Sequence, residues 1–345
     1  MWDHVDSLLE RTDSPTDVLR VHRVELLEAR RRQAAGSPLD AGLIADQTRA
    51  AVDELAVIPV LARARAAYDG PLVLMKGPEV ALDYGQTGLR AFGDLDLLTD
   101  DAEAAQAALI DAGFQEVFDP DVYAGIHHLR PLWWPGLPLV IELHMRANWP
   151  AAIPGPSTED LLAAAVPSRL PVPGIDTLPP EHHALLLAGH AWEHQPLGRL
   201  GNLVDVAVML RRSDEAEVAR LAREWGCQRM WRTTRAAVRS VVDGDGRSAA
   251  VAIWARHLRG VRERTVFEWH LKDLLAPVWG MPARAAIRAV RAELRATLGR
   301  MRHEPRRAKI KRAALAVRNA RVARSEHNLA LEARGIGSTT TEEAG

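Results

Sequence analysis

Apolar and polar positions follow a helical spacing at both ends of the chain and a strand-like spacing in between. Over residues 1–69, apolar residues recur three and four positions apart, which is typical of amphipathic helices. Helical spacing returns after residue 177 and continues to about residue 334. Between these regions, short apolar runs rich in branched residues predict strands over residues 71–75, 94–99, 114–118 and 139–145.

This order of elements predicts an α+β protein with four parts. A compact mixed unit of strands and helices is expected between an N-terminal helical segment and a larger all-helical C-terminal domain. The proline-rich stretch PAAIPGPSTED marks the second boundary, and the small, polar stretch GIGSTTTEEAG predicts a disordered tail. The expected parts are residues 1–69, 70–150, 151–334 and 335–345.

Composition limits the class of protein. The 345 residues carry a formal net charge of −1, so the molecule as a whole has no electrostatic preference for nucleic acids or membranes. The single cysteine, Cys227, excludes a disulfide framework within one chain and fits a reducing compartment. The N-terminal segment lacks a signal-peptide pattern, and no apolar run approaches the roughly 20 residues that span a bilayer. We therefore expect a cytoplasmic protein without membrane association.

One segment has a strong local charge asymmetry. Residues 300–324 contain ten Lys or Arg residues and one acid, Glu304. Such a segment can bind RNA, DNA or another polyanion, or it can be the solvated face of helices in an arginine-rich chain. No aromatic residues that would stack on bases are interleaved, which favours the second interpretation.

Two acids lie inside an apolar strand in the segment GDLDLL, residues 93–98. Side chains on a strand alternate between its faces, so Asp94 and Asp96 point the same way while Leu95 and Leu97 face the core. Two carboxylates this close in an apolar setting need a compensating charge. A divalent cation supplies one, and Mg²⁺ is usually held by one or two protein carboxylates together with substrate phosphates.

A third acid occurs on another expected strand. Glu142 lies in the middle of LVIELHM, residues 139–145, and would join Asp94 and Asp96 if the two strands are neighbours. Three carboxylates can hold two metal ions, which activate a nucleophile and stabilise a leaving pyrophosphate. The alternative is a chance D-x-D pair whose acids are solvated at a strand end. Spacing alone does not decide between these interpretations.

Several motifs together resemble a known family. LMKGPEVALDYGQTGLRAFGDLDLLTDDAEAAQAALIDAGF and VIELHMRANW, within residues 71–149, are similar to the uncharacterised nucleotidyltransferase family of the DNA polymerase β-like superfamily. The family pattern is L-K-G, a helix, R-x-x-G-D-[IL]-D-L-L-V, a second helix ending in G-[FY], and later [VI]-[DE]-L-H. Residues 190–210, HAWEHQPLGRLGNLVDVAVML, resemble the helical region of the same family.

The resemblance implies a minimal nucleotidyltransferase α/β domain. Such domains move a nucleoside monophosphate from an NTP to an acceptor with two Mg²⁺ ions. By position, Asp94 and Asp96 would bind both metals, and Glu142 would be the third metal ligand and the base for the acceptor hydroxyl. Glu142 replaces the more usual aspartate of the family, and Thr99 the more usual valine. These three acids are the expected catalytic and metal-binding residues.

The resemblance also implies a nucleotide side of the site. Lys76 and Gly77 stand where the superfamily grips the triphosphate, and an ammonium there suits phosphate oxygens. Arg90 would pair with a phosphate or with the first aspartate of the motif. Gly93 lets a ligand approach the backbone, and His144 shares the face of the third acid and could orient it or contact phosphate. The expected nucleotide-binding residues are Lys76, Gly77, Arg90, Gly93 and His144.

The remaining histidines offer weaker signals. HAWEH places His190 and His194 four residues apart on one helical face, which can line the nucleotide cleft. A zinc site is disfavoured because the motif is not H-E-x-x-H and lacks a third ligand. The adjacent pair at residues 127–128 is interpreted as structural.

Two functional hypotheses follow. The first is a Mg²⁺-dependent nucleotidyltransferase that moves an NMP from an NTP to a hydroxyl-bearing acceptor by a two-metal mechanism. The second is a non-catalytic or degenerate transferase-like protein that binds a polyanion through its basic C-terminal helices. The sequence leaves open the NTP, the acceptor (small molecule, peptide, protein or RNA end) and whether a nucleotidyl or a phosphoryl group is transferred.

Overall fold

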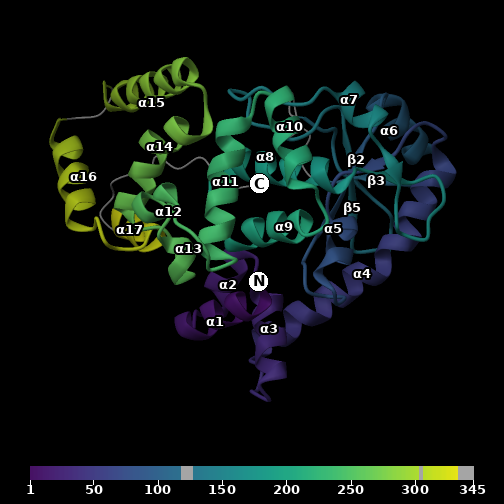
Figure 1. Ribbon diagram of the computed structural model, residues 1–345, viewed down its shortest axis with the longest axis horizontal. Coiled ribbons are helices and arrows are strands. Elements are labelled where there is room, and N and C mark those ends of the chain that lie inside the picture. Colours follow the sequence, from purple (N-terminus) through teal and green to yellow (C-terminus); the bar gives the residue numbers. More distant parts are fainter. Residues whose placement is uncertain (118–126, 303–305, 333–345) are drawn as a thin grey trace.

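The structure, a computed structural model, describes residues 1–117, 127–302 and 306–332. Its N-terminal segment is helical, as the apolar spacing predicts, and consists of α1 (Trp2–Thr12), α2 (Thr16–His22), α3 (Glu25–Ala34) and α4 (Ala41–Ala67). Figure 1 shows the long α4 leading from this group toward the sheet. Asp40 caps α4, because its carboxylate accepts a hydrogen bond from the amide of Leu43 at 2.9 Å.

The described strands form one mixed sheet. They are β1 (Val73–Leu74), β2 (Asp94–Leu98), β3 (Gln115–Glu116), β4 (Leu132–Trp133), β5 (Val140–His144), β6 (Val166–Pro167) and β7 (Asp176–Thr177). Their order across the sheet is β3-β4-β5-β2-β1-β7-β6. β2 lies in the middle, parallel to β5 and antiparallel to β1. Together with the helices around it, this sheet confirms the predicted α+β fold.

Helices surround the sheet and make up most of the chain after it. Those within the sheet region are α5 (Pro78–Ala81), the 3₁₀ turn η1 (Leu82–Tyr84), α6 (Ala102–Asp111) and α7 (Thr158–Ala163). The later helices are α8 (Pro180–His194), α9 (Leu200–Leu210), α10 (Glu215–Glu224), α11 (Gln228–Val241), α12 (Ala249–Ile253), α13 (His257–Gly260), α14 (Val266–Gly280), α15 (Ala283–Arg302), α16 (Arg306–Arg318) and α17 (Arg324–Glu332). Figure 1 shows α8 and α9 next to the sheet and α14 to α17 at the opposite end of the molecule from the sheet.

The two faces of the sheet bury different sets of residues. Leu95 and Leu97 of β2 pack with α4 and α6 in one core, whereas Leu98 belongs to a larger core formed with α8 and α9. The alternation predicted for β2 is therefore confirmed, and it leaves Asp94 and Asp96 on the face toward α8. A one-residue slip of β2 would bury both acids among leucines, so the hydrophobic core fixes the register that positions them.

The sheet also takes strands from beyond residue 150. β7 pairs in parallel with β1, and β6 pairs antiparallel to β7. Neither strand was expected, because two residues are too few to show a period-two pattern and Pro167 disfavours a strand prediction.

Two sequence predictions fall on residues that are not described. The tail expected to be disordered, residues 335–345, lies outside the described residues, as do the side chains at positions 300–309, 312 and 313 of the basic segment. In the part of the chain that is described, no helix combines the length and apolarity needed to cross a membrane.

Candidate active site

Strands β2 and β5 bring the predicted acids to one face of the sheet. In their parallel register Asp96 stands opposite Glu142, and Leu98 stands opposite His144. The side chain of Asp96 is only 1% exposed, and that of Glu142 is 19% exposed. A carboxylate as buried as Asp96 is uncommon unless it is paired, so its contacts define the site.

Asp96 lies between an ammonium and an imidazole. Its Oδ2 is 3.0 Å from Nζ of Lys76, and its Oδ1 accepts a hydrogen bond from Nε2 of His144 at 2.9 Å. Burial opposes the charge of Asp96, but Lys76 and His144 outweigh it and hold the pKa of this carboxyl well below its usual range. Likewise, burial opposes the charges of Lys76 and His144, yet the acids around them raise the pKa of both groups. Asp96 is therefore ionised at neutral pH.

Asp94 lies at the rim of the same site. Its side chain is 36% exposed, and its Oδ2 is 3.7 Å from Nζ of Lys76. Burial and the neighbouring charge of Asp96 raise the pKa of Asp94, while Lys76 opposes this rise. Because one ammonium faces two carboxylates, the ionised pair retains negative charge for another cation.

Histidines surround Glu142. Its Oε2 lies 3.6 Å from Nε2 of His144 and 3.6 Å from Nε2 of His128. Nδ1 of His128 donates to the carbonyl of Leu129 at 2.7 Å, which turns Nε2 toward Glu142. The sequence interpretation missed the position of His128, because adjacency to His127 does not reveal which ring faces an acid.

The donor atoms fit a divalent cation. Ligand atoms of Asp96, Glu142 and His144 all lie within 4.8 Å of one another. Oδ2 of Asp96 is buried and, within the described residues, meets Lys76 as an ion pair without a well-aligned hydrogen bond. Carboxylate oxygens suit Mg²⁺ and Mn²⁺, and an added imidazole also suits metals such as Fe²⁺. This group contains His144, which was expected on the nucleotide side, but does not contain Asp94.

The turn after β1 requires a glycine. Gly77 has φ 70° and ψ −123°, a conformation that strains any other residue. A Cβ at this position would also lie 3.4 Å from the carbonyl oxygen of Asp94. The turn therefore packs directly against the start of β2, and it places Lys76 beside both aspartates.

Arg90 holds this turn from the side. Its Nε and Nη2 donate to the two carboxylate oxygens of Asp205 at 2.7 and 3.0 Å, and its Nη1 donates to the carbonyl of Gly77 at 3.2 Å. The hydroxyl of Tyr84 donates to Asp205 at 2.6 Å. Of the two expected partners of Arg90, a phosphate or Asp94, the second is not its partner in the structure, because Arg90 binds Asp205 of α9.

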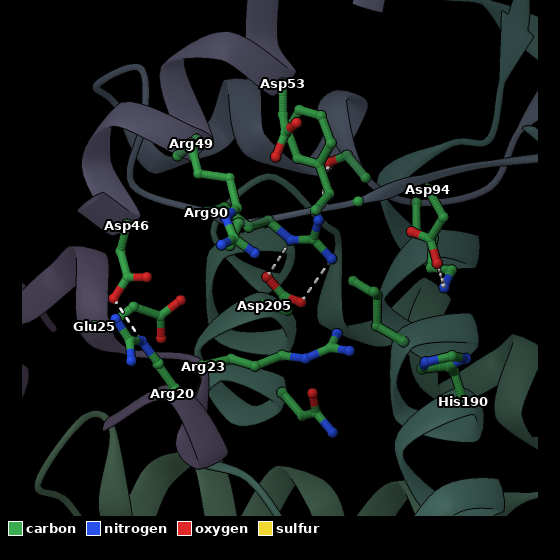
Figure 2. A pocket seen from close by; sticks show the side chains of 18 of the residues that line it. Arg20, Arg23, Glu25, Asp46, Arg49, Asp53, Arg90, Asp94, His190 and Asp205 are labelled. Atoms are coloured by element: carbon green, nitrogen blue, oxygen red, sulfur yellow. Dashed lines mark hydrogen bonds and ion pairs between the residues drawn. The ribbon is translucent and has the colours of Figure 1, made fainter. Parts of the chain in front are cut away.

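A cavity of about 520 Å³ opens beside Asp94 (Figure 2). This volume is within the range of small-molecule sites. A Cβ built on Gly93 would meet nothing within 4 Å, so the space in front of this residue is open. The predicted residues that line the cavity are Lys76, Gly77, Arg90, Gly93 and Asp94.

Helix α8 supplies one wall of the cavity. His190 lines it, whereas His194, the other member of the expected histidine face, does not, and Nδ2 of Asn148 lies 3.3 Å from Nδ1 of His190 and 3.0 Å from Nε2 of His194. Burial, with Lys76 adding to it, lowers the pKa of His190 well below its usual value, so this ring is neutral. Within the described residues, His190 and His194 belong to no group that could hold a metal ion.

The opposite wall comes from the N-terminal helices, which the sequence did not connect with the site. Figure 2 shows Arg23 reaching across the cavity toward His190. No motif links this segment to the acids, so only the fold reveals its contribution. Its lining residues are Arg20, Arg23, Glu25, Asp46, Arg49 and Asp53.

The sequence is similar to one family of known proteins. A family model described as an uncharacterised nucleotidyltransferase matches residues 42–243. The chain belongs to this family. The match covers more than half of the chain and includes the three acids, so it confirms the resemblance indicated by the motifs. Searches of curated proteins and of solved structures found no match.

Membership in the nucleotidyltransferase family supports a general role in nucleotidyl transfer with an NTP as substrate. The matched residues contain Lys76, Arg90 and Asp205 as well as the acids. Arg20 and Arg23 precede residue 42, so the N-terminal wall of the cavity lies outside the matched region.

Proposed function

We propose that this protein is a metal-dependent nucleotidyltransferase that transfers an NMP from an NTP to the hydroxyl group of an acceptor. The observation that carries the proposal is the buried carboxylate of Asp96, which lies opposite Glu142 in adjacent strands and is paired with Lys76, a residue that lines the open cavity. An ionised acid at this depth is costly to maintain, which is typical of a functional site.

Asp94, Asp96 and Glu142, with His144 alongside, would hold the divalent cations, of which two Mg²⁺ are proposed. When bound, such ions polarise the phosphate and lower the pKa of the attacking hydroxyl. His144 keeps Asp96 in place through its hydrogen bond, and it also lies beside Glu142.

In the proposed step the hydroxyl oxygen of the acceptor forms a bond to the α-phosphorus of the NTP. The bond from the α-phosphorus to the oxygen that bridges to the β-phosphate breaks, and pyrophosphate leaves. Glu142 takes the proton of the hydroxyl. The side chain of Glu142 is 19% exposed and that of Asp96 only 1%, so Glu142 is the more accessible of the two acids to an acceptor.

Lys76 and the turn at Gly77 are proposed to bind the triphosphate. Lys76 lines the cavity, and its ammonium faces the two aspartates in the absence of other cations. Gly93 leaves room for the nucleotide. Arg90 lines the same cavity, and its contacts with Gly77 and Asp205 give it the role of holding the phosphate-binding turn.

A labelling assay tests the proposal. The full-length protein is incubated with Mg²⁺, a cell extract and each of the NTPs, labelled either on the α- or on the γ-phosphate. Transfer of the α-label alone indicates a nucleotidyl transfer. Transfer of the γ-label alone would indicate a phosphoryl transfer and would contradict the proposed step.

Variants connect the activity with the site. Asp94→Asn and Asp96→Asn should reduce the labelling at least 100-fold, because each removes a carboxylate that holds the metal. Asp111→Asn makes the same chemical change on the exposed end of α6 and serves as the matched control. Full labelling by both site variants would show that the activity does not depend on this site.

A further inference from the structure

A second cavity adjoins the one beside Asp94. Its volume is about 580 Å³, and Arg20 and Arg23 line both cavities, so the two meet at the C-terminal end of α2. We call it the arginine cavity, because six of its lining residues are Arg20, Arg23, Arg199, Arg262, Arg264 and Arg324. Among the residues that the structure describes, the only carboxylate lining it is that of Glu263, although Arg20 is paired with Asp46 and Arg262 with Glu268. In a chain with a net charge of −1, this is a marked local excess of positive charge.

Arg264 is a buried cation in this cavity. The residue is 5% exposed, and its guanidinium donates to the carbonyl oxygens of Pro196 and Leu197 at 2.6 and 2.7 Å. Its Nε is buried without a hydrogen-bond partner, and within the described residues no carboxylate lies within 4.0 Å of it. Burial lowers the pKa of Arg264 to about 10. Neutral oxygens accept hydrogen bonds from its Nη atoms, and the charges of Glu268 and Asp273 act on it only from a distance, which leaves a buried cation without a direct counter-ion.

Arg23 is held rigidly where the cavities meet. It has φ 54° and ψ 45°, a left-handed conformation that is rare for residues with a side chain. A Cβ on Gly201 would lie 2.6 Å from the carbonyl oxygen of Arg23, so α9 packs tightly against this turn. The neighbouring His22 accepts a hydrogen bond from the amide of Leu200 and donates to the carbonyl of Arg262.

The side chain of Arg23 is available for a ligand. Within the described residues its guanidinium makes no hydrogen bond or ion pair, and Figure 2 shows it pointing into the cavity beside Asp94, toward His190. The left-handed conformation ends α2, and the close packing against Gly201 fixes this turn, so the unpaired cation of Arg23 is presented from a rigid position.

We propose that the arginine cavity binds a phosphate monoester on the acceptor, so that the acceptor is a phosphorylated small molecule with a free hydroxyl. This deepens the proposed function and rests on it. Guanidinium groups bind phosphate oxygens in pairs, and a dianion would compensate Arg264 and Arg23 together. The volume of the arginine cavity suits a small molecule, and its junction with the first cavity leads from the anchored phosphate toward Asp94. The phosphate of the acceptor is bound and not consumed.

A binding experiment without metal tests the anion site by itself. Phenyl phosphate is titrated into the full-length protein in EDTA and followed by ³¹P NMR. We expect saturable one-to-one binding that weakens at least tenfold in Arg264→Met and in Arg23→Met. The exposed Arg23 keeps the test decisive if Arg264→Met does not fold. Arg256→Met, an exposed arginine that lines neither cavity, should bind like the wild type.

Three results would overturn the inference. The first is an affinity that is the same in all arginine variants. The second is equal binding of diphenyl phosphate, because a diester lacks the terminal dianion. The third is tighter, arginine-dependent binding of an RNA oligonucleotide without a terminal phosphate, which would indicate a nucleic acid instead.

A second arm tests whether the bound phosphate belongs to the acceptor. The small-molecule fraction of a cell extract is treated with alkaline phosphatase, which is then removed before the protein, Mg²⁺ and α-labelled NTP are added. We expect the labelled product to disappear, and its persistence would overturn the inference while leaving the transferase proposal intact. If phenyl phosphate binds as expected but untreated extract yields no labelled product, the transferase proposal fails and the anion site stands.

Discussion

Lys76 and Asp96 form a buried ion pair, with Nζ 3.0 Å from Oδ2. Lys76 follows β1 and Asp96 lies within the neighbouring strand β2, so the ion pair connects these two strands at the centre of the site. Buried pairs of this kind add little net stability, but breaking one leaves an uncompensated charge. In this site the ammonium of Lys76 supplies the positive charge that partly neutralises Asp94 and Asp96.

Replacing Lys76 should therefore make the free energy of unfolding depend more strongly on bound metal than it does in the wild type. In EDTA, Lys76→Met should lower the free energy of unfolding by about 3–5 kcal/mol, because the carboxylate of Asp96 remains buried without its counter-ion. Saturating Mg²⁺ should restore part of this loss. Chemical denaturation with and without Mg²⁺ measures both effects. Lys272→Met removes a lysine that is paired with Asp273 and leaves the acids intact, so Mg²⁺ should stabilise it only as much as it stabilises the wild type.

The same reasoning predicts direct binding of a metal. Mn²⁺, followed by electron paramagnetic resonance, should bind the wild type, and Glu142→Gln should weaken this binding at least tenfold because it removes a ligand charge. Metal at 100 times its dissociation constant should stabilise the wild type by about 2.7 kcal/mol. Glu103→Gln on the exposed face of α6 is the control. Unchanged Mn²⁺ affinity in Glu142→Gln would remove Glu142 from the metal site.

Local alternation was sufficient to predict the centre of the site. Because side chains on a strand alternate, Leu95 and Leu97 enter one core and leave Asp94 and Asp96 on the other face. Glu142 joins the aspartates only if β2 and β5 are neighbouring strands. The sequence does not determine this pairing, and the structure shows it. The spacing of the motifs was enough to identify the family, which the family comparison confirms.

Contacts between distant segments could not be read from the pattern. Arg90 binds Asp205 across 115 residues, and an arginine ahead of G-D-x-D gives no indication of a partner on a later helix. Arg23 lines the cavity through a left-handed turn that carries no glycine signal. His128 faces Glu142 because of a single β-bridge with His144. Each depends on tertiary packing rather than on local periodicity.

Asp205 binds Arg90 and Tyr84, and variants of these two residues should lower the stability by different amounts. Arg90→Met should cost about 3–5 kcal/mol of unfolding free energy, because Asp205 remains buried without its cation. Tyr84→Phe should cost only about 1 kcal/mol, the usual value of one hydrogen bond. Denaturant titrations give both values.

The double variant Arg90→Met with Asp205→Leu tests what Arg90 does beyond this pair. Its stability should recover relative to Arg90→Met, because no charge is left buried. Its transferase activity should stay low, because the carbonyl of Gly77 has lost its donor and the phosphate-binding turn is no longer held. Recovery of both stability and activity would show that Arg90 serves only to compensate Asp205.

Buried His22 should make the fold sensitive to acid. Burial, with Arg264, Arg199 and Arg262 adding to it, lowers the pKa of His22 from 6.5 to about 4. Between these values the unfolded chain binds a proton that the folded chain does not, so the free energy of unfolding falls as the pH falls from 6.5 to 4. The fall due to this group should be roughly 3 kcal/mol, since one pKa unit corresponds to about 1.4 kcal/mol.

His22→Asn isolates this contribution. The asparagine oxygen can still accept a hydrogen bond from the amide of Leu200, but the side chain does not titrate. His183, whose pKa is also lowered to about 4 by burial, remains in both proteins, so the difference between them reports on His22. Urea denaturation at pH 7, 5.5 and 4 should show a smaller loss of stability in the variant, by roughly 3 kcal/mol at pH 4. Parallel curves for the two proteins would mean that His22 does not titrate in this range.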